Sequence, residues 1–176
     1  MYALKVNKQR KNGYKETRNF RQLKNILIEA SISKSFEDAI NEWSETNRYY
    51  VSDDGNNCIC GKTNIREICI ITNILSGREL TVGNCCIKRF CDTDSNLFFK
   101  ALAKISNDRT RSANAALIKF AHNQNVFNHW EFAFYSNIWR KHKKTLSLKQ
   151  LARKQYLNEK LLESFKIPNI PNGGLM

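Results

Sequence analysis

The sequence predicts an α+β fold, in which a small cysteine-flanked β-hairpin module lies between helices and a helical C-terminal half follows. Three observations lead to this prediction. Apolar residues recur at helical spacing in both the N-terminal and the C-terminal parts of the chain, isoleucine-rich strand segments lie between them, and closely spaced cysteines stand on either side of those strands.

The chain has 176 residues, enough for one ordinary domain with an apolar core. Its 29 basic and 16 acidic residues give a net charge of +13, which attracts polyanions such as nucleic acid, although such a charge can also serve solubility alone. The chain shows neither an apolar run of the ~20 residues that span a membrane nor a secretory signal. We therefore expect a soluble, intracellular protein that does not contact membranes.

The N-terminal part is expected to be a basic flexible arm (residues 1–19) followed by helices (residues 20–47). Residues 1–24 hold eight basic side chains against one acid. From Phe20 onward apolar positions recur at helical spacing, and the segment Ser35-Phe36-Glu37-Asp38 resembles a capping box that opens a second helix running through Trp43.

Strand-forming residues follow in the next segment (residues 48–92). Residues 49–52 favour a strand, residues 53–57 form a dense turn signal, and residues 65–75 and 79–82 favour two further strands joined through Ser76-Gly77-Arg78. Gly83 should end the last strand, and Asn84 can cap a short helix that carries Cys85 and Cys86. A β-hairpin leading into a helix fits this region best.

The rest of the chain is expected to be a basic helical region (residues 93–166) and a loose tail (residues 167–176). Apolar stripes predict helices near residues 97–105 and 113–121, and two more over residues 128–142 and 147–165. Pro168 and Pro171 then end regular structure.

The cysteine spacing predicts a metal site. An intracellular chain rarely keeps its cysteines as disulfides, so the six present here point to metal binding or to buried thiols. Two cysteines on a tight turn, with a glycine that lets the backbone bend, can supply half of a tetrahedral Zn²⁺ shell. Cys58-Ile59-Cys60-Gly61 has this form, and a helix N-terminus after the hairpin would stabilise further thiolates.

We therefore expect Zn²⁺ to be bound by Cys58, Cys60 and Cys86, with Cys85 as the fourth ligand. Adjacent helical side chains point about 100° apart, so Cys85 and Cys86 both reach one ion only if the turn is irregular. Cys91 and His122 are the alternative fourth ligands. Cys69 stands within an apolar run and is interpreted as a buried strand thiol. The cysteine turn at Cys58-Ile59-Cys60-Gly61, the hairpin and the helix start follow one another in the order of a treble-clef-like zinc module.

Residues 43–92 resemble a small zinc-finger-like module of uncharacterised bacteriophage and large DNA virus proteins. The resemblance rests on Cys58-Ile59-Cys60-Gly61-Lys62 and on Val82-Gly83-Asn84-Cys85-Cys86-Ile87-Lys88-Arg89-Phe90, and extends weakly to residue 162 through Leu146-Ser147-Leu148-Lys149-Gln150. It implies a viral zinc-binding protein in the host cytoplasm, and it selects Cys86 over Cys85 as the third ligand. Where the family often has histidine, this chain has Lys62.

A nucleic-acid surface is expected on the basic C-terminal helices, where eight basic residues and one acid lie between residues 140 and 160. Lysine and arginine neutralise phosphates, and nearby aromatic rings such as Trp139 and Tyr156 can stack on unpaired bases. Trp130, Phe134 and Ile138 are spaced as helix core. The expected nucleic-acid contacts are Lys141, Lys143, Lys144, Lys149, Arg153, Lys154, Lys88 and Arg89.

These features favour a non-catalytic, zinc-stabilised protein that binds DNA or RNA. A viral interaction protein that binds and inhibits a host enzyme, with a purely structural zinc, is the alternative, because an acidic partner surface is attracted by the same charge. A metal-dependent nuclease fits less well, since the hairpin holds no histidine base and, apart from Glu67 and Glu79, no carboxylate.

Overall fold

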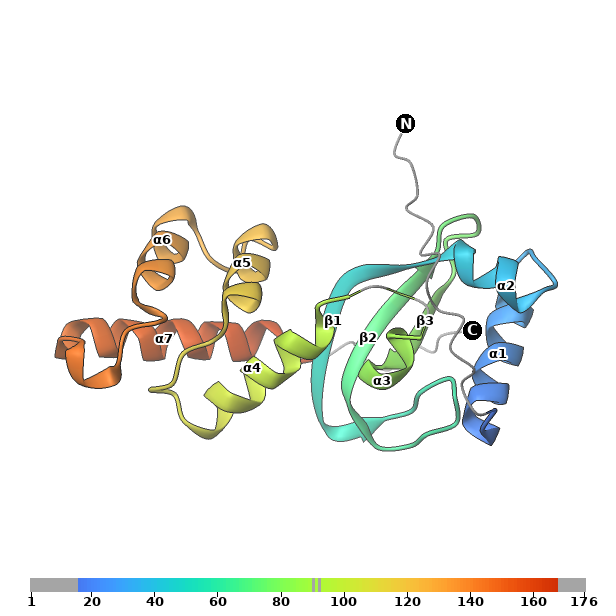
Figure 1. Ribbon diagram of the computed structural model, residues 1–176, viewed down its shortest axis with the longest axis horizontal. Coiled ribbons are helices and arrows are strands. Elements are labelled where there is room, and N and C mark those ends of the chain that lie inside the picture. The colour runs from blue at the N-terminus through green and yellow to red at the C-terminus, as the bar shows by residue number, and fades with distance from the viewer. Residues whose placement is uncertain (1–15, 90, 92, 168–176) are drawn as a thin grey trace.

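The computed structural model describes residues 16–89, 91 and 93–167, so most of the expected arm and tail lies outside the described residues. The α+β prediction is confirmed. The described part of the chain forms seven α-helices and one three-stranded antiparallel sheet, with α1 and α2 at one end of the molecule and α5 and α6 at the other (Figure 1).

Helix α1 spans Arg18–Ala30, capped by Thr17, and its buried stripe includes Leu23 and Leu27. Ser35 caps the short helix α2 (Phe36–Ala39) as expected. The prediction that this helix runs through Trp43 is wrong, because a single 3-10 turn (Ile40–Glu42) follows α2 and the chain is then extended. The Glu42 carbonyl accepts a hydrogen bond from the Ile74 N–H at 2.7 Å, which ties the end of the turn to the hairpin instead of to a further helical residue.

The sheet has the strand order β1-β2-β3, with β1 at Trp43–Asn56, β2 at Ile65–Asn73 and β3 at Glu79–Gly83. The expected hairpin is confirmed as β2 and β3, which pair from Ile68 opposite Gly83 to Thr72 opposite Glu79. Strand β1 is much longer than the four residues expected. Its pairing with β2 is interrupted by two irregularities, one of which contains Asn47 at a φ of 57°.

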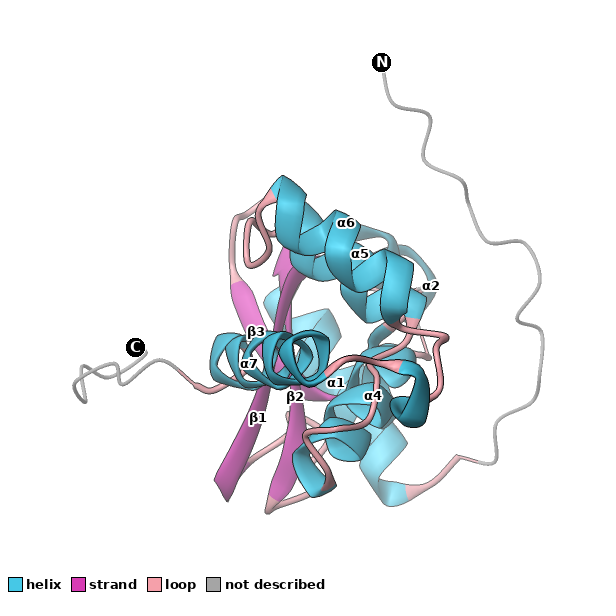
Figure 2. Cartoon of the chain, turned by 90° about the vertical axis from the view of Figure 1, so that its left-hand side faces the viewer, coloured by secondary structure: helices cyan, strands magenta, loops and turns pink. Residues whose placement is uncertain are grey.

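Helix α3 (Asn84–Ile87) follows β3 directly, and Gly83 rather than Asn84 occupies its N-cap position. The C-terminal helices are α4 (Ser95–Asn107), α5 (Ala115–Asn123), α6 (His129–Ile138) and α7 (Leu148–Ser164). Asn128 and Ser147 open α6 and α7 through capping boxes. Helix α6 ends before residue 142, and a short 3-10 turn (Lys143–Thr145) joins it to α7. Helices α5 and α6 pack side by side (Figure 2).

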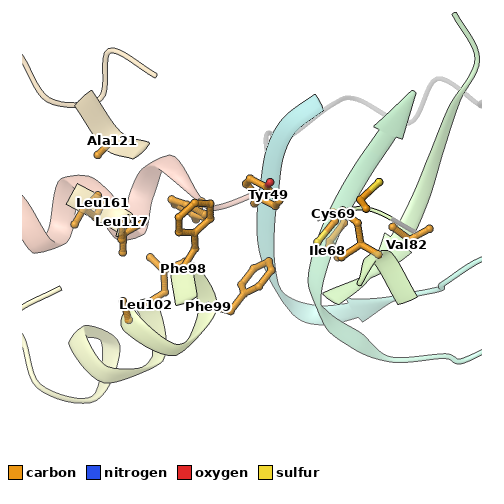
Figure 3. Packing of buried hydrophobic residues seen from close by; sticks show 14 of the residues in the cluster. Tyr49, Ile68, Cys69, Val82, Phe98, Phe99, Leu102, Leu117, Ala121 and Leu161 are labelled. Atoms are coloured by element: carbon orange, nitrogen blue, oxygen red, sulfur yellow. The ribbon is translucent and has the colours of Figure 1, made fainter. Parts of the chain in front are cut away.

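One continuous core joins the sheet to the helices (Figure 3). Tyr49 of β1 makes this junction, because its ring packs edge-on against Phe98 and Phe99 of α4 at centroid distances of 5.4 and 6.3 Å. The end of α7 returns to the same strand, where the Val51 N–H donates to the Phe165 carbonyl at 2.7 Å. The helical half is therefore anchored to the sheet by apolar packing and by backbone hydrogen bonding.

A buried polar network holds α6 and α7 against the segment before α5. The Tyr135 hydroxyl accepts a hydrogen bond from the Ala113 N–H at 3.0 Å and donates to the side-chain oxygen Oδ1 of Asn158. Asn158 in turn donates to the backbone carbonyls of Arg109 and Arg111, at 2.7 and 2.8 Å. The buried Tyr135 hydroxyl and the Asn158 side-chain amide are thus paired with the backbone before α5 and with each other. Among the described helices, none is both long and apolar enough to cross a membrane.

Candidate metal centre

Three of the predicted ligands come together in the structure. Cys58 and Cys60 lie in the turn between β1 and β2, and Cys86 lies in α3. Their three sulfur atoms are all within 4.8 Å of one another, a spacing that a single metal ion can bridge. All six cysteines are free thiols, so no disulfide competes for these sulfurs. Cys58 and Cys60 are buried and Cys86 is half-buried.

Local hydrogen bonds shape the turn that carries the first two cysteines. The Cys58 N–H donates to the Lys62 carbonyl and the Gly61 N–H donates to the Cys58 carbonyl, each at 2.9 Å. Gly61 has a φ of +83°, a left-handed conformation that glycine adopts without steric cost. This tight turn directs both thiol side chains to the same side of the backbone.

Helix α1 supports this turn from outside. The Asn19 side-chain amide donates to the Cys60 carbonyl at 2.8 Å. A Cβ atom at Gly61 would lie closer to the Gln22 side-chain amide than van der Waals contact allows. The N-terminal helix therefore packs against the cysteine turn, and a side chain at Gly61 would disturb that packing as well as strain the backbone.

The hairpin brings the third cysteine to the turn. The Ile59 N–H donates to the Thr81 carbonyl of β3 at 3.3 Å, which fixes the turn beside the last strand. The chain then passes through Gly83, whose N–H points at the Cys58 sulfur at 3.3 Å, and enters α3 with Cys86. Backbone N–H donors of this kind stabilise a thiolate.

The cysteine cluster is polarised toward ionisation of Cys58. The Cys86 thiol donates to the Cys58 sulfur, and this hydrogen bond, with further donation from the backbone of Cys60 and Gly83, holds the pKa of Cys58 well below its usual range. The same interaction raises the pKa of Cys86, because its proton is held between the two sulfurs. A cation placed among the sulfurs would displace that proton, and thiolate is the form that binds metal. The donor set therefore fits a metal ion that prefers sulfur ligands.

The structure does not bring any of the three candidate fourth ligands into this cluster. Cys85 is exposed and lines a cavity of about 270 Å³ together with the three clustered cysteines. Cys91 is buried apart from the cluster, near the backbone of Glu45. His122 belongs to α5, where its ring stacks on Phe132 at 4.4 Å. Cys69, as expected, is a fully buried strand thiol, and burial raises its pKa to about 12.

The expected nucleic-acid residues divide into three environments. Lys141, Lys143, Lys144 and Lys149 are exposed around the start of α7. Lys88 and Arg89 are half-buried after α3, and the Arg89 guanidinium lies 4.6 Å from the Phe20 ring centroid. Lys154, in contrast, is only 1% exposed and is removed from the expected contacts, because its side chain points into the molecule.

Side chains from α6 and α7 form an exposed stack, although the spacing of one of them, Trp130, predicts a core position. Trp130 is 56% exposed, not buried as its spacing suggested, and Tyr156 is 51% exposed. The Arg153 guanidinium lies 5.0 Å from the Trp130 ring and 4.9 Å from the Tyr156 ring. We call Trp130, Arg153 and Tyr156 the aromatic-arginine stack. The spacing of Arg153 and Tyr156 by three residues on a helix is the sequence signal for it.

Buried Glu131 fixes the arginine of this stack. Its carboxylate lies 3.3 Å from the Arg153 guanidinium and 2.7 Å from the Lys160 ammonium. The Lys160 hydrogen bond, the Asn128 N–H and the two cations hold the pKa of Glu131 below its usual value although burial opposes this. The stack is thus held in position by a charged group from the neighbouring helix.

Comparisons with protein-family models, with curated proteins and with solved structures give no match for this chain.

Proposed function

We propose that the protein is a zinc-stabilised, non-catalytic nucleic-acid-binding protein that contacts single-stranded segments of DNA or RNA. The observation that carries this proposal is the aromatic-arginine stack, which exposes two large rings beside a run of exposed lysines. Bases stack on aromatic rings with little dependence on sequence, and lysines neutralise the phosphates between them.

The stack offers a binding surface on α6 and α7. A base would extend it on the exposed part of the Tyr156 ring, because Phe134 already stacks on the Trp130 ring at a centroid distance of 5.3 Å. Each stacked base adds ~1–3 kcal/mol to binding. Lys143, Lys144 and Lys149 lie around the start of α7. They can therefore contact the phosphates of the nucleic-acid backbone as it leaves the stack. None of the carboxylates that the structure describes lies within 4.0 Å of their ammonium groups.

Zinc is the metal we assign to the cysteine cluster. Thiolate sulfurs in a tetrahedral arrangement are typical of structural Zn²⁺ sites, and zinc needs no redox chemistry to be held there. The turn, the β2-β3 hairpin and α3 follow one another in the order of a treble-clef-like module. Cys85, on the rim of the same cavity, is the proposed fourth ligand. It would reach the ion by a local rearrangement of α3. The zinc would supply folding free energy.

The viral origin implied by the resemblance of residues 43–92 is part of this proposal. A nuclease reading has less support, because in the part of the chain that the structure describes the candidate metal cluster contains three cysteines and no carboxylate or histidine. Glu67 lines the same cavity outside the cluster, but its carboxylate accepts a hydrogen bond from the Asn84 side-chain amide at 2.7 Å, which weakens it as a general base.

Binding to labelled single-stranded oligonucleotides across a salt series tests the proposal. We expect log affinity to fall linearly with log salt, with little dependence on sequence. Tyr156→Ala should weaken binding about tenfold without changing the salt slope, since it removes stacking and no charge. Leu75→Ala, at another exposed apolar side chain, is the matched control.

Two results would contradict the proposal. One is the absence of oligonucleotide binding at low salt by the zinc-loaded protein. The other is equal affinity of Tyr156→Ala and Leu75→Ala, which would show that charge alone attracts the oligonucleotide. Co-purification of one host protein together with either result would favour the interaction protein that inhibits a host enzyme.

A further inference from the structure

A second basic feature lies away from the aromatic-arginine stack, in a pocket between α4, the segment before α5 and the end of α6. The pocket has a volume of about 320 Å³. Its polar lining residues are Lys100, Lys104, Ser112, Asn114, Trp139 and Arg140, with no acidic side chain among them. Three cations therefore converge on a concave site.

Buried Lys154 adds a fourth positive charge behind this pocket. Its side chain is 1% exposed, and its ammonium lies 3.4 Å from the Ser112 hydroxyl oxygen. None of the carboxylates that the structure describes lies within 4.0 Å of it. Burying an ammonium group without a paired anion is costly. The fold nevertheless keeps a cation at this position without a close counter-charge.

The charged groups that act on Lys154 do not compensate it. Asp108 is the opposing charge, while Lys104 and Lys143 add to the positive potential, and burial lowers the pKa of Lys154. Asp108 also faces a second cation, because the Arg111 guanidinium lies 3.7 Å from its carboxylate. The surroundings of the pocket therefore carry an excess of positive charge.

Two groups in the pocket are already oriented for an anion. The Ser112 oxygen lines the pocket and accepts from Lys154, and no described acceptor takes the Ser112 hydroxyl proton. That proton is available to a ligand oxygen. The Arg140 guanidinium lies 4.7 Å from the centroid of the Trp139 ring, which restricts its movement at the rim. Preorganised donors lose less entropy on binding.

We propose that this pocket binds a phosphate group, supplied by the backbone of the bound nucleic acid. The source of the phosphate rests on the proposed function, whereas the pocket itself does not. Lys100, Lys104 and Arg140 would donate to the phosphate oxygens from the rim, and the Ser112 hydroxyl would donate from the floor. Lys154 would strengthen that hydroxyl as a donor and neutralise part of the phosphate charge.

A phosphate suits the site better than a carboxylate. Several oxygens can each receive one of the separate donors, and the number of cations matches an anion of more than one oxygen and of high charge density. One pocket of this kind would also give the polynucleotide a fixed position on the protein, since phosphate contacts set register while exposed rings contact the bases.

The test uses the zinc-loaded full-length chain and two probes, inorganic phosphate and a single-stranded oligonucleotide. The rim variant Lys104→Ala/Arg140→Ala is compared with the doubly substituted control Lys34→Ala/Arg78→Ala, which lowers the net charge equally at two exposed positions outside the proposed binding surface. Thermal shift measures phosphate binding, and fluorescence anisotropy measures oligonucleotide binding. Ser112→Ala and Lys154→Met test the floor of the pocket, and circular dichroism checks that every variant is folded.

We expect inorganic phosphate to raise the melting temperature of the wild type and the control but not of the rim variant. The rim variant should bind the oligonucleotide about tenfold more weakly than the control, because it loses charge-assisted hydrogen bonds as well as net charge. Ser112→Ala and Lys154→Met should each reduce the phosphate response. Lys154→Met should keep its melting temperature without phosphate, since it replaces a buried charge by an apolar chain.

The pocket assignment is overturned if the rim variant and the control respond equally to phosphate and bind the oligonucleotide equally. If that happens while the wild type binds oligonucleotides, the proposed function stands without the pocket. If phosphate binds in the pocket but no oligonucleotide binds, the phosphate site stands, its source is a free phosphate or a small phosphate ester, and the proposed function fails.

Discussion

The sulfur atoms of Cys58 and Cys86 lie within 4.8 Å of each other, although one belongs to the turn before β2 and the other to the helix after β3. The whole hairpin separates these residues along the chain. A metal held between them would therefore tie the start of the module to its end, and loss of that metal should be felt by the sheet and by α3 together.

Substitution of Cys86 by serine should abolish tight zinc binding and lower stability. A ligand present at 1,000 times its dissociation constant stabilises the folded state by ~4 kcal/mol, which corresponds to roughly 8–16 °C in the melting temperature of a chain of this size. Differential scanning fluorimetry with and without a chelator measures this. Cys85→Ser, at an exposed neighbour, should lower zinc affinity by a smaller amount. Unchanged zinc affinity in Cys85→Ser would show that water, not Cys85, completes the shell.

Gly61→Ala should destabilise the protein and weaken zinc binding, because alanine is strained at a φ of +83° and its methyl group displaces Gln22. Gly77, at a φ of +72° in the hairpin turn, has open space around it and provides the control. Each substitution should cost ~1–2 kcal/mol in backbone strain. Only Gly61→Ala should also reduce zinc affinity, as measured by competition with a chelating dye. Equal zinc affinities would show that the packing of α1 on the turn has no effect on the metal.

Ionised Glu42 should stabilise the folded state, so that its contribution to stability is larger at neutral pH than at acid pH. Its buried carboxylate accepts hydrogen bonds from the Ile32 N–H, the Ser33 N–H and the Asn73 amide at 2.7–2.9 Å, and the pKa of Glu42 falls from 4.5 to about 2. This contribution is fully present above pH 4.5 and is lost as the pH falls toward 2.

Urea unfolding of the wild type and Glu42→Gln at pH 7 and at pH 3 checks the contribution of Glu42. We expect Glu42→Gln to be less stable at pH 7 and the gap between the two proteins to narrow at pH 3. Glu29→Gln, at an exposed position on α1, is the control and should show no gap at either pH. A gap between wild type and Glu42→Gln that stays constant with pH would contradict the role assigned to the ionised carboxylate.

Tyr135→Phe should destabilise the protein by ~1–3 kcal/mol, because it leaves the buried Ala113 N–H without its acceptor. The same change at Tyr156, an exposed ring, removes a hydroxyl that water can solvate and should cost less than about 0.5 kcal/mol. Chemical denaturation of both variants provides the comparison. If the two substitutions cost the same, the Tyr135 network does not hold α6 and α7 as described.

The hairpin and the cysteine cluster were predictable because their signals are local. Branched apolar residues on either side of Ser76-Gly77-Arg78 fix the hairpin register, and the hairpin then carries Cys86 back toward the turn that holds Cys58. The N-caps at Ser35 and Ser147 were predictable for the same reason, since a cap depends only on its own helix.

Three features were not predictable, because tertiary contacts decide them. Strand β1 is mostly polar and interrupted, and it forms where β2 offers an edge to pair with. Lys154 stands in a run of basic residues that indicates a wet surface, yet the helix face it occupies is covered by the segment before α5. Trp130 has core spacing, but its ring instead pairs with Arg153 at the surface.

The zinc site is tested by the metal content of the purified protein, measured by elemental mass spectrometry with thiol labelling before and after chelation. We expect about one zinc per chain, with Cys58, Cys60, Cys85 and Cys86 protected from labelling until the metal is removed. A protein that contains no metal, and in which the half-buried thiol of Cys86 is labelled at the same rate with and without a chelator, would contradict this expectation.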